Sequence, residues 1–287
     1  MLKALIVTVA YNPPTSLLDN LQVDYYPHMV VDNSEQETIW LRDYCAEHNH
    51  VYQWLGDNLG IAKALNVGAE YAIENGFDYI VTMDQDSRLN VFMLVSVTHF
   101  IIDFSNNELV ALFSPFHSLD GIKSNSSCVM VNEIVMTSGN FVNLSIWKKL
   151  NGYNELLFID MVDGDFCSRA IINGYQTILI PWITLEHTLG IYHSRMVFFG
   201  VVLDTYCHNK IRKFYQARNT LYCFSIYKKY KNTQFNNIYE FHLGMFKEFI
   251  VKMPLKILCL EEHKISKLIY FFKGVFSFLL NKFICRM

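Results

Sequence analysis

The first hundred residues alternate between short apolar runs and segments with helical periodicity. The apolar runs, which we interpret as buried strands, are residues 2–10, 28–32, 51–55 and 78–83. The helical patterns between them cover residues 15–22, 35–48 and 61–75. This alternation predicts an α/β fold in which helices cover both faces of a mostly parallel sheet. Ligands of such sheets bind at the carboxyl ends of the strands.

The chain beyond residue 100 is less regular. Its pattern predicts strands over 109–114 and 128–137 and a short helix over 146–150. Residues 247–287 carry eight Lys or Arg and three Asp or Glu, interleaved with Phe, Ile and Leu. We therefore expect an α/β domain over residues 1–220 and a helical, basic and apolar extension over 221–287, without a sharp boundary at 220–235.

Composition narrows the class of protein. Of the 287 residues, 52% are hydrophobic and 18% charged, which excludes a disordered or fibrous chain. A net charge of −3 gives no global reason to bind nucleic acid. Seven cysteines without a C-x-x-C pair favour a reducing cytosol and argue against a sulfur-based metal site. The apolar start of the chain is too short for a signal peptide, and we expect no membrane-spanning helix.

Three acidic positions stand where ligands of a parallel sheet bind. Asp32 ends one predicted strand, and the pair Asp84 and Asp86 follows another; Asp163 and Asp165 lie further along the chain. Each aspartate alone is typical of a turn or a helix cap. Two carboxylates in a D-x-D at a strand end are also suited to Mg²⁺ or Mn²⁺, which take remaining ligands from water and a substrate diphosphate.

Several motifs occur in an order that resembles the family 2 glycosyltransferases. They begin with Val31-Asp-Asn-Ser, Asn58-Leu-Gly-Ile-Ala-Lys-Ala-Leu-Asn and Asp84-Gln-Asp-Ser. The later ones are Thr137-Ser-Gly-Asn, Leu157-Phe-Ile-Asp-Met-Val-Asp, Leu185-Glu-His-Thr-Leu-Gly and Arg212-Lys-Phe-Tyr-Gln-Ala-Arg-Asn. The set covers residues 3–220 and is similar to the bacterial rhamnosyltransferase branch, which builds O-antigen, capsule and related polysaccharides. The resemblance implies a GT-A fold, a nucleotide-sugar donor and inversion at the anomeric carbon.

The resemblance also implies roles on the donor side of the site. Asp32 would hold the base or ribose, and Asp86 would be the main metal ligand with Asp84 as its donor-side partner. The segment 58–66 would lie beside the nucleotide, which adds Asn58, Gly60 and Lys63 to the donor-binding residues. Gly60 would let the backbone approach the ligand closely, although an ordinary helix N-terminus explains the same segment.

Asp163 matches the second residue, the aspartate, of the family's Glu-Asp base motif. Val162 stands here in the place of the Glu. An inverting transfer needs one carboxylate to take the acceptor hydroxyl proton. Asp163 is the expected base. Asp165 is the second candidate, on the acceptor side, or else a helix cap, and Asp160 is a further candidate for the base. Arg169 is placed to pair with a carboxylate, either in the site or in a structural ion pair.

Four further residues complete the expected site. By the resemblance, Ser138 and Gly139 shape the acceptor side, and His187 contacts the metal or the diphosphate, although a lone histidine is often simply packed. Arg218 lies in a basic tract that a solvated surface also explains. A guanidinium there would bind the leaving diphosphate in pairs of hydrogen bonds.

Residues 265–284 are strongly apolar with three interspersed lysines, too short between charges to span a bilayer. Such a helix is typical of the membrane interface and of anionic lipids; covering the catalytic domain or forming a homodimer contact is the alternative. A helix in the membrane interface fits a lipid-linked saccharide acceptor and a peripheral position of the protein on the cytoplasmic face of the membrane.

The leading hypothesis is therefore a metal-dependent, inverting transfer of L-rhamnose from dTDP-rhamnose. The same site with a UDP- or GDP-hexose, or an inactive homologue that acts as an assembly partner, stays open. A dehydrogenase or methyltransferase is disfavoured because residues 10–15, after the first strand, contain no glycine.

Overall fold

The computed structural model describes residues 2–119, 124, 126–187, 193–198 and 201–284. The chain divides into two compact units, which are described separately. The first unit comprises residues 1–158 and 162–188, and the second comprises 159–161 and 189–287. The second unit thus begins about thirty residues before the boundary expected from the sequence.

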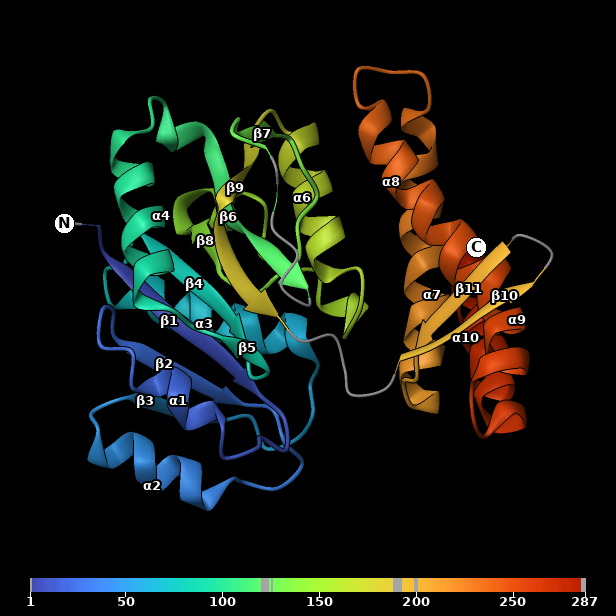
Figure 1. Cartoon of the computed structure of the whole chain (residues 1–287), viewed down its shortest axis with the longest axis horizontal. Coiled ribbons are helices and arrows are strands. Elements are labelled where there is room, and N and C mark those ends of the chain that lie inside the picture. The colour runs from blue at the N-terminus through green and yellow to red at the C-terminus, as the bar shows by residue number, and fades with distance from the viewer. Residues whose placement is uncertain (1, 120–123, 125, 188–192, 199–200, 285–287) are drawn as a thin grey trace. The chain divides into compact units, whose positions relative to one another are not determined.

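A mixed sheet forms the centre of the first unit, in the order β3-β2-β1-β4-β8-β6-β9-β5, with β7 paired to β9 (Figure 1). Its strands are β1 Ala4–Ala10, β2 His28–Asp32, β3 Val51–Trp54, β4 Tyr79–Asp84, β5 Ser87–Arg88, β6 Val110–Leu119, β7 Met130–Val131, β8 Asn140–Asn143 and β9 Gln176–His187. β3, β2, β1 and β4 are parallel, and β8 runs antiparallel between β4 and β6. The predicted α/β class with a largely parallel sheet is confirmed.

Helices cover both faces of this sheet. They are α1 Leu17–Leu21, α2 Ile39–Glu47, α3 Ile61–Glu74, α4 Val91–Asp103, α5 Leu144–Lys149 and α6 Val162–Ile172, with short 3₁₀ turns at Asn107–Leu109 and Glu155–Leu157. On one face α4 packs on alternate strand residues such as Ile6, Val81 and Phe113, all fully buried. On the other face Gly68 of α3 lies directly against Val7 of β1, because only a residue without a side chain leaves room for so close an approach.

The second unit is mainly helical and contains the hairpin of β10 His193–Phe198 and β11 Val201–Tyr206. Its helices are α7 Lys210–Tyr227, α8 Asn236–Phe246, α9 Met253–Leu260 and α10 Lys264–Ile284, with a 3₁₀ turn at Lys228–Tyr230 and a π-helical turn at Lys247–Lys252. α7 packs along α10, where Gly274 lies against the backbone of Phe214. Ala217, Met253, Ile257 and Phe271 form the buried core. This packing joins α7 to the C-terminal helices.

No helix within the described ranges is long and apolar enough to cross a membrane.

Candidate active site

The carboxyl ends of the parallel strands bring the first two acidic positions to one edge of the sheet. Asp32, the last residue of β2, pairs in register with Ala10 of β1, and Asp84, the last residue of β4, pairs with Val9. The two aspartates therefore flank the end of β1. Two strand spacings separate them, which is about 10 Å between their backbones.

Asp32 is wholly buried and organises the loop that follows β2. Its Oδ1 accepts from the backbone N–H of Ser34 at 3.0 Å, and its Oδ2 accepts from the N–H of Thr38 at 2.9 Å and the hydroxyl of Tyr52 at 2.6 Å. Burial acts to raise the pKa of Asp32, but the hydrogen bonds from Ser34, Tyr52 and Thr38 outweigh it and hold the pKa below its usual value. The carboxylate is thus ionised and fixed.

An amide pair joins this loop to the segment before α3. The side chain of Asn33 donates to Oδ1 of Asn58 at 3.1 Å, and its own Oδ1 accepts from the N–H of Leu59 at 2.8 Å. Oδ1 of Asn58 also accepts from the N–H of Gly60 at 3.2 Å. Asn58 therefore lies beside the Asp32 loop, and whether it also contacts a nucleotide stays a prediction.

The D-x-D segment is anchored through its middle residue. Oε1 of Gln85 accepts from the backbone N–H of Tyr11 at 2.7 Å, and its Nε2 donates to the carbonyl of Tyr11 at 3.1 Å. This pair of bonds ties the ends of β1 and β4 together. Asp84 is half-buried, whereas the side chain of Asp86 is exposed.

The donor set fits a cation that is only partly coordinated by protein. Among the described residues, no group of three or more His, Cys, Asp or Glu could hold a metal ion by itself. Asp84 and Asp86 offer hard oxygen ligands at an open edge, and Mg²⁺ or Mn²⁺ takes such carboxylates together with water and phosphate oxygens. Asp84 and Asp86 are therefore the residues that would hold the ion.

Ser138 and Gly139 lie against the end of β4. The hydroxyl oxygen of Ser138 accepts from the N–H of Asp84 at 3.2 Å, and the N–H of Gly139 donates to the carbonyl of Thr82 at 2.6 Å. Gly139 has a φ of +76°, and a side chain there would meet Leu185 at 2.8 Å. Both residues therefore support the strand that carries Asp84. Their role on the acceptor side stays a prediction.

The backbone at Gly60 closely approaches another part of the protein, Phe158. Gly60 has a φ of +89°, and a Cβ at this position would lie 2.6 Å from the carbonyl oxygen of Phe158. The same carbonyl accepts from the N–H of Ile61 at 2.7 Å, which starts α3. The expected need for glycine is thus explained by Phe158 within the chain. Nearby, Lys63 pairs with Glu155 at 3.2 Å in an exposed ion pair, which is weak enough to exchange partners.

Asp163 is the second residue of α6 and is half-buried. Its Oδ1 accepts from the N–H of Gly164 at 2.8 Å. The N-terminus of a helix stabilises a negative charge, so the position suits an ionised carboxylate. Three residues just before it, Phe158, Asp160 and Met161, have φ values of +56°, +62° and +65°, which side chains of this kind seldom adopt.

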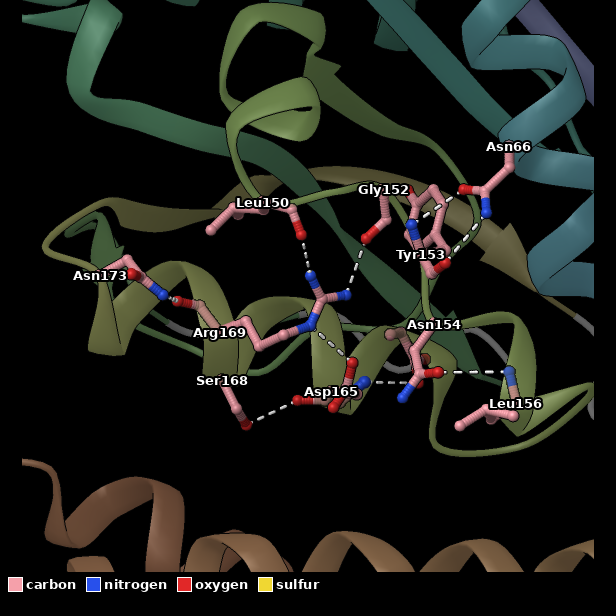
Figure 2. A network of polar contacts seen from close by, with 12 residues as sticks. Asn66, Leu150, Gly152, Tyr153, Asn154, Leu156, Asp165, Ser168, Arg169 and Asn173 are labelled. Atoms are coloured by element: carbon pink, nitrogen blue, oxygen red, sulfur yellow. Dashed lines mark hydrogen bonds and ion pairs between the residues drawn. The ribbon is translucent and has the colours of Figure 1, made fainter.

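Asp165 is committed to a structural network, seen in Figure 2. It is buried, and its Oδ2 accepts from Nε of Arg169 at 2.7 Å. The other guanidinium nitrogens of Arg169 donate to the carbonyls of Leu150 at 2.6 Å and Gly152 at 2.8 Å. Of the two alternatives for Arg169, the structure thus has the structural ion pair. Asp165 is therefore a poor runner-up for the base.

The remaining predicted residues lie at the end of the sheet and in the second unit. His187 is the last residue of β9 and pairs in register with Ser87, next to Asp86 in the chain; its side chain lies outside what the structure describes. Arg218 belongs to α7, where its Nε donates to Oδ1 of Asn219 at 2.9 Å and its guanidinium lies 4.8 Å from the ring centre of Tyr215. Burial lowers the pKa of Arg218.

Sequence reasoning missed the residues that hold this edge together. Gln85 was visible only as the middle of the D-x-D, and Tyr11 only as part of the glycine-free segment after the first strand. Trp54, whose Nε1 donates to the carbonyl of Ser34 at 2.9 Å while 39% of the residue is exposed, ends β3 at the same edge. A signal existed, because polar and aromatic residues directly after parallel strands gather at one edge.

No family model matches the chain. The chain is 28% identical over 237 residues, 74% of its own length and 77% of the relative's, to a dTDP-rhamnosyl transferase RfbF of Shigella flexneri.

Solved structures share the fold at low sequence identity. One is TarS 1-349 of S. aureus in complex with UDP-GlcNAc, with a TM-score of 0.62, 13% identity and coverage of 96% of this chain and 80% of that chain. Another is GalNAc-T7 with UDP, GalNAc and Mn²⁺, with a TM-score of 0.54, 12% identity and coverage of 89% and 58%. The chain has the GT-A fold and is similar in sequence to a dTDP-rhamnosyl transferase, as the sequence motifs predicted.

Proposed function

We propose that this enzyme transfers L-rhamnose from dTDP-rhamnose, with inversion, to a hydroxyl of a lipid-linked cell-surface glycan. The observation that carries the proposal is the D-x-D at the carboxyl end of β4, with Asp86 exposed, at the same sheet edge where Asp32 ends β2. The relative acts on dTDP-rhamnose by its name, and the solved neighbours hold UDP or UDP-GlcNAc. Those similarities support a nucleotide-sugar donor and favour the dTDP sugar.

The proposed chemistry divides between two carboxylate sites. Asp84 and Asp86 would hold Mg²⁺ or Mn²⁺, which neutralises the charge of a departing diphosphate. Asp163 takes the proton of the acceptor hydroxyl while that oxygen attacks the sugar from the face opposite the diphosphate. Lys63, released from its exposed pair with Glu155, can approach a phosphate. Arg218 is proposed as a further contact to the diphosphate, and His187 as a contact to the metal or the diphosphate.

A thermal-shift titration with nucleotides tests the donor. We expect dTDP with Mn²⁺ to raise the melting temperature of the wild type more than UDP or GDP does. Asp86→Asn should lose the metal-dependent part, because the amide keeps the shape but removes the negative charge. Asp103→Asn, an exposed aspartate at the end of α4, is the control and should respond like the wild type. A larger shift with UDP or GDP would discard rhamnose, and no shift with any nucleotide would overturn the proposal.

Transfer assays test the base. Asp163→Asn should abolish transfer of rhamnose while the dTDP response persists, because the substitution removes the proton acceptor and preserves the shape. Full transfer by this variant would refute the role of Asp163.

We further propose that α10 lies on the anionic cytoplasmic face of the membrane, where a lipid-linked acceptor is found. Apolar side chains at 265, 269, 272, 276 and 280 are between 48% and 78% exposed. Residues 264–284 contain no Asp or Glu, and of their four lysines Lys264 and Lys273 are exposed, whereas Lys267 is buried against Glu261. The exposed face of the helix therefore complements anionic lipid. A second copy would face it with like charge.

Co-sedimentation with vesicles tests this surface. We expect binding to phosphatidylcholine vesicles that contain phosphatidylglycerol and little binding without it. The double variant Phe272→Ser/Phe276→Ser should lose binding, whereas Phe92→Ser, which removes a still more exposed ring from α4, should not. Equal binding by both variants, or a wild-type dimer that only the double variant dissociates, would contradict the membrane proposal.

A further inference from the structure

The residues just before α6 adopt an unusual backbone. Asp160 and Met161 have positive φ values although neither is glycine, and Phe158 before them has one as well. Such conformations persist only where the surroundings fix them, and they gather at functional sites. The relevant question is therefore which groups hold residues 159–161, two residues ahead of Asp163.

Two side chains of α7 hold this segment within the second unit. The guanidinium of Arg212 donates to the carboxylate of Asp160 from two nitrogens, from Nε at 3.1 Å to Oδ2 and from Nη2 at 2.9 Å to Oδ1. Nδ2 of Asn219 donates to the carbonyl of Ile159 at 2.7 Å and, at 3.3 Å, to that of Asp160. Arg212 and Asn219 are seven residues apart, so they lie on one face of the helix, two turns apart.

The two contacts are themselves held in place. Asn209, the N-cap of α7, accepts from the backbone N–H of Arg212 at 2.8 Å. Nε of Arg218 donates to Oδ1 of Asn219 at 2.9 Å, which fixes the amide so that its nitrogen faces the carbonyls of the loop. Asn219 is fully buried, whereas 37% of the Arg212 side chain is exposed.

Asp160 is thereby removed from the competition for the base. Its carboxylate is largely buried and engaged at both oxygens by one guanidinium. A carboxylate held at both oxygens by a guanidinium is not free to contact an acceptor hydroxyl. The carboxylate of Asp160 instead binds Arg212 and so anchors the loop to α7.

We propose that Arg212 and Asn219 are positioning residues, which set the backbone path of residues 159–161 and so the place of Asp163 at the start of α6. This inference rests on the proposed function of Asp163 as base. The loop is joined to that residue through Val162 alone, so a change of its path moves the carboxylate. Misplacement of a reacting group by about 1 Å can cost about 100-fold in rate.

The decisive variant is Arg212→Lys, which keeps the charge but loses the two-nitrogen grip. We expect kcat to fall about 10- to 100-fold, with an unchanged KM for the donor, an unchanged dTDP response and an unchanged melting temperature. Lys228→Gln, an exposed lysine just after α7, is the control and should behave as the wild type. Because Asn219 is fully buried, Asn219→Asp is a second test that counts only if the variant melts as the wild type does.

A double-variant cycle separates positioning from general damage. Asp160→Asn and Arg212→Gln should each lower kcat, and the combination should be no slower than the worse single variant, because both remove one contact. Additive losses, a wild-type kcat in Arg212→Lys, or a parallel change of kcat, KM and melting temperature would overturn the inference. Asp163→Asn is measured beside them: if it is inactive while Arg212→Lys is fully active, the positioning role alone fails, whereas an active Asp163→Asn removes the proposed base itself.

Discussion

A buried group of charges in the second unit gives the sharpest prediction on stability. Glu261, between α9 and α10, accepts from Nζ of Lys213 at 2.7 Å, from Nζ of Lys267 at 2.8 Å and from the hydroxyl of Thr205 at 2.8 Å. The side chains of Lys213 and Glu261 are 0% exposed and that of Lys267 is 8% exposed. The group thus connects α7, α10 and β11 through one carboxylate.

The perturbation is Glu261→Gln, which keeps volume and shape but removes the charge. Burial acts to raise the pKa of Glu261, and the two lysines outweigh it and hold the pKa low, so the wild-type side chain is ionised. The variant leaves two ammonium groups buried without a counter-charge. Breaking a buried ion pair in this way costs about 3–5 kcal/mol, and we expect the free energy of unfolding to fall by that amount.

Urea denaturation monitored by two probes measures the effect. The four tryptophans are Trp40, Trp54, Trp147 and Trp182, all in the first unit, so their fluorescence reports on that unit. Circular dichroism at the helix band also reports on the helical second unit. The unfolding transition seen by circular dichroism should shift to a lower urea concentration in the variant.

The neighbouring Glu262 is exposed, so Glu262→Gln is a matched control, with an expected change within about 0.5 kcal/mol. The triple replacement Lys213→Met/Glu261→Leu/Lys267→Met should be far less damaging than Glu261→Gln, because no unpaired charge is left buried. A loss below about 1 kcal/mol in Glu261→Gln, or a loss as large in Glu262→Gln, would refute the reasoning.

Two further substitutions test single positions. Gly60→Ala should cost about 2–3 kcal/mol in urea denaturation, because its φ is positive and its Cβ would meet the carbonyl of Phe158; Gly76→Ala, with open space around a φ of +72°, should cost less, and equal losses would contradict the clash. Burial lowers the pKa of His242 to about 3, so the unfolded chain binds a proton more readily and stability should fall by about 2 kcal/mol from pH 7 to pH 5. His242→Phe, which can keep the stack on Tyr227, should flatten that dependence, and an unchanged slope would disprove it.

Strands β1, β2 and β4 could be predicted because each is a largely apolar run that is buried on both faces. Strand β3, at the edge of the sheet, is half-buried to exposed and was predicted from its aromatic and β-branched residues. β2 has the predicted bounds, and β1, β3 and β4 differ by one or two residues at their ends. The helix expected from residue 35 begins at Ile39 instead, because the N–H of Thr38 is bound by the carboxylate of Asp32. The strand expected over 128–137 shortens to Met130–Val131, and Asn132 after it has a φ of +61°, which ends an extended strand.

The site was less predictable because its contacts join residues far apart in the chain. The sequence placed aspartates at strand ends, since that depends on local pattern alone. It could not show that Gln85 bonds to Tyr11, 74 residues away, or that Arg212 grips Asp160, 52 residues away. Nor could it separate Asp165 from Asp163, two positions apart on one helix, until Arg169 was seen to engage the former.

The aspartates at the sheet edge differ in what remains for a ligand. A carboxylate has about four acceptor sites, and three at Asp32 are taken by Ser34, Thr38 and Tyr52 in a fully buried setting. We therefore expect the base or ribose of the donor to meet the loop that Asp32 orders more than the carboxylate itself. Asp86 is exposed, which leaves it available to a cation. Removal of the Asp32 carboxylate should consequently weaken nucleotide binding with and without metal, because it disorders the loop. Removal of the Asp86 carboxylate should weaken only the metal-dependent part of nucleotide binding.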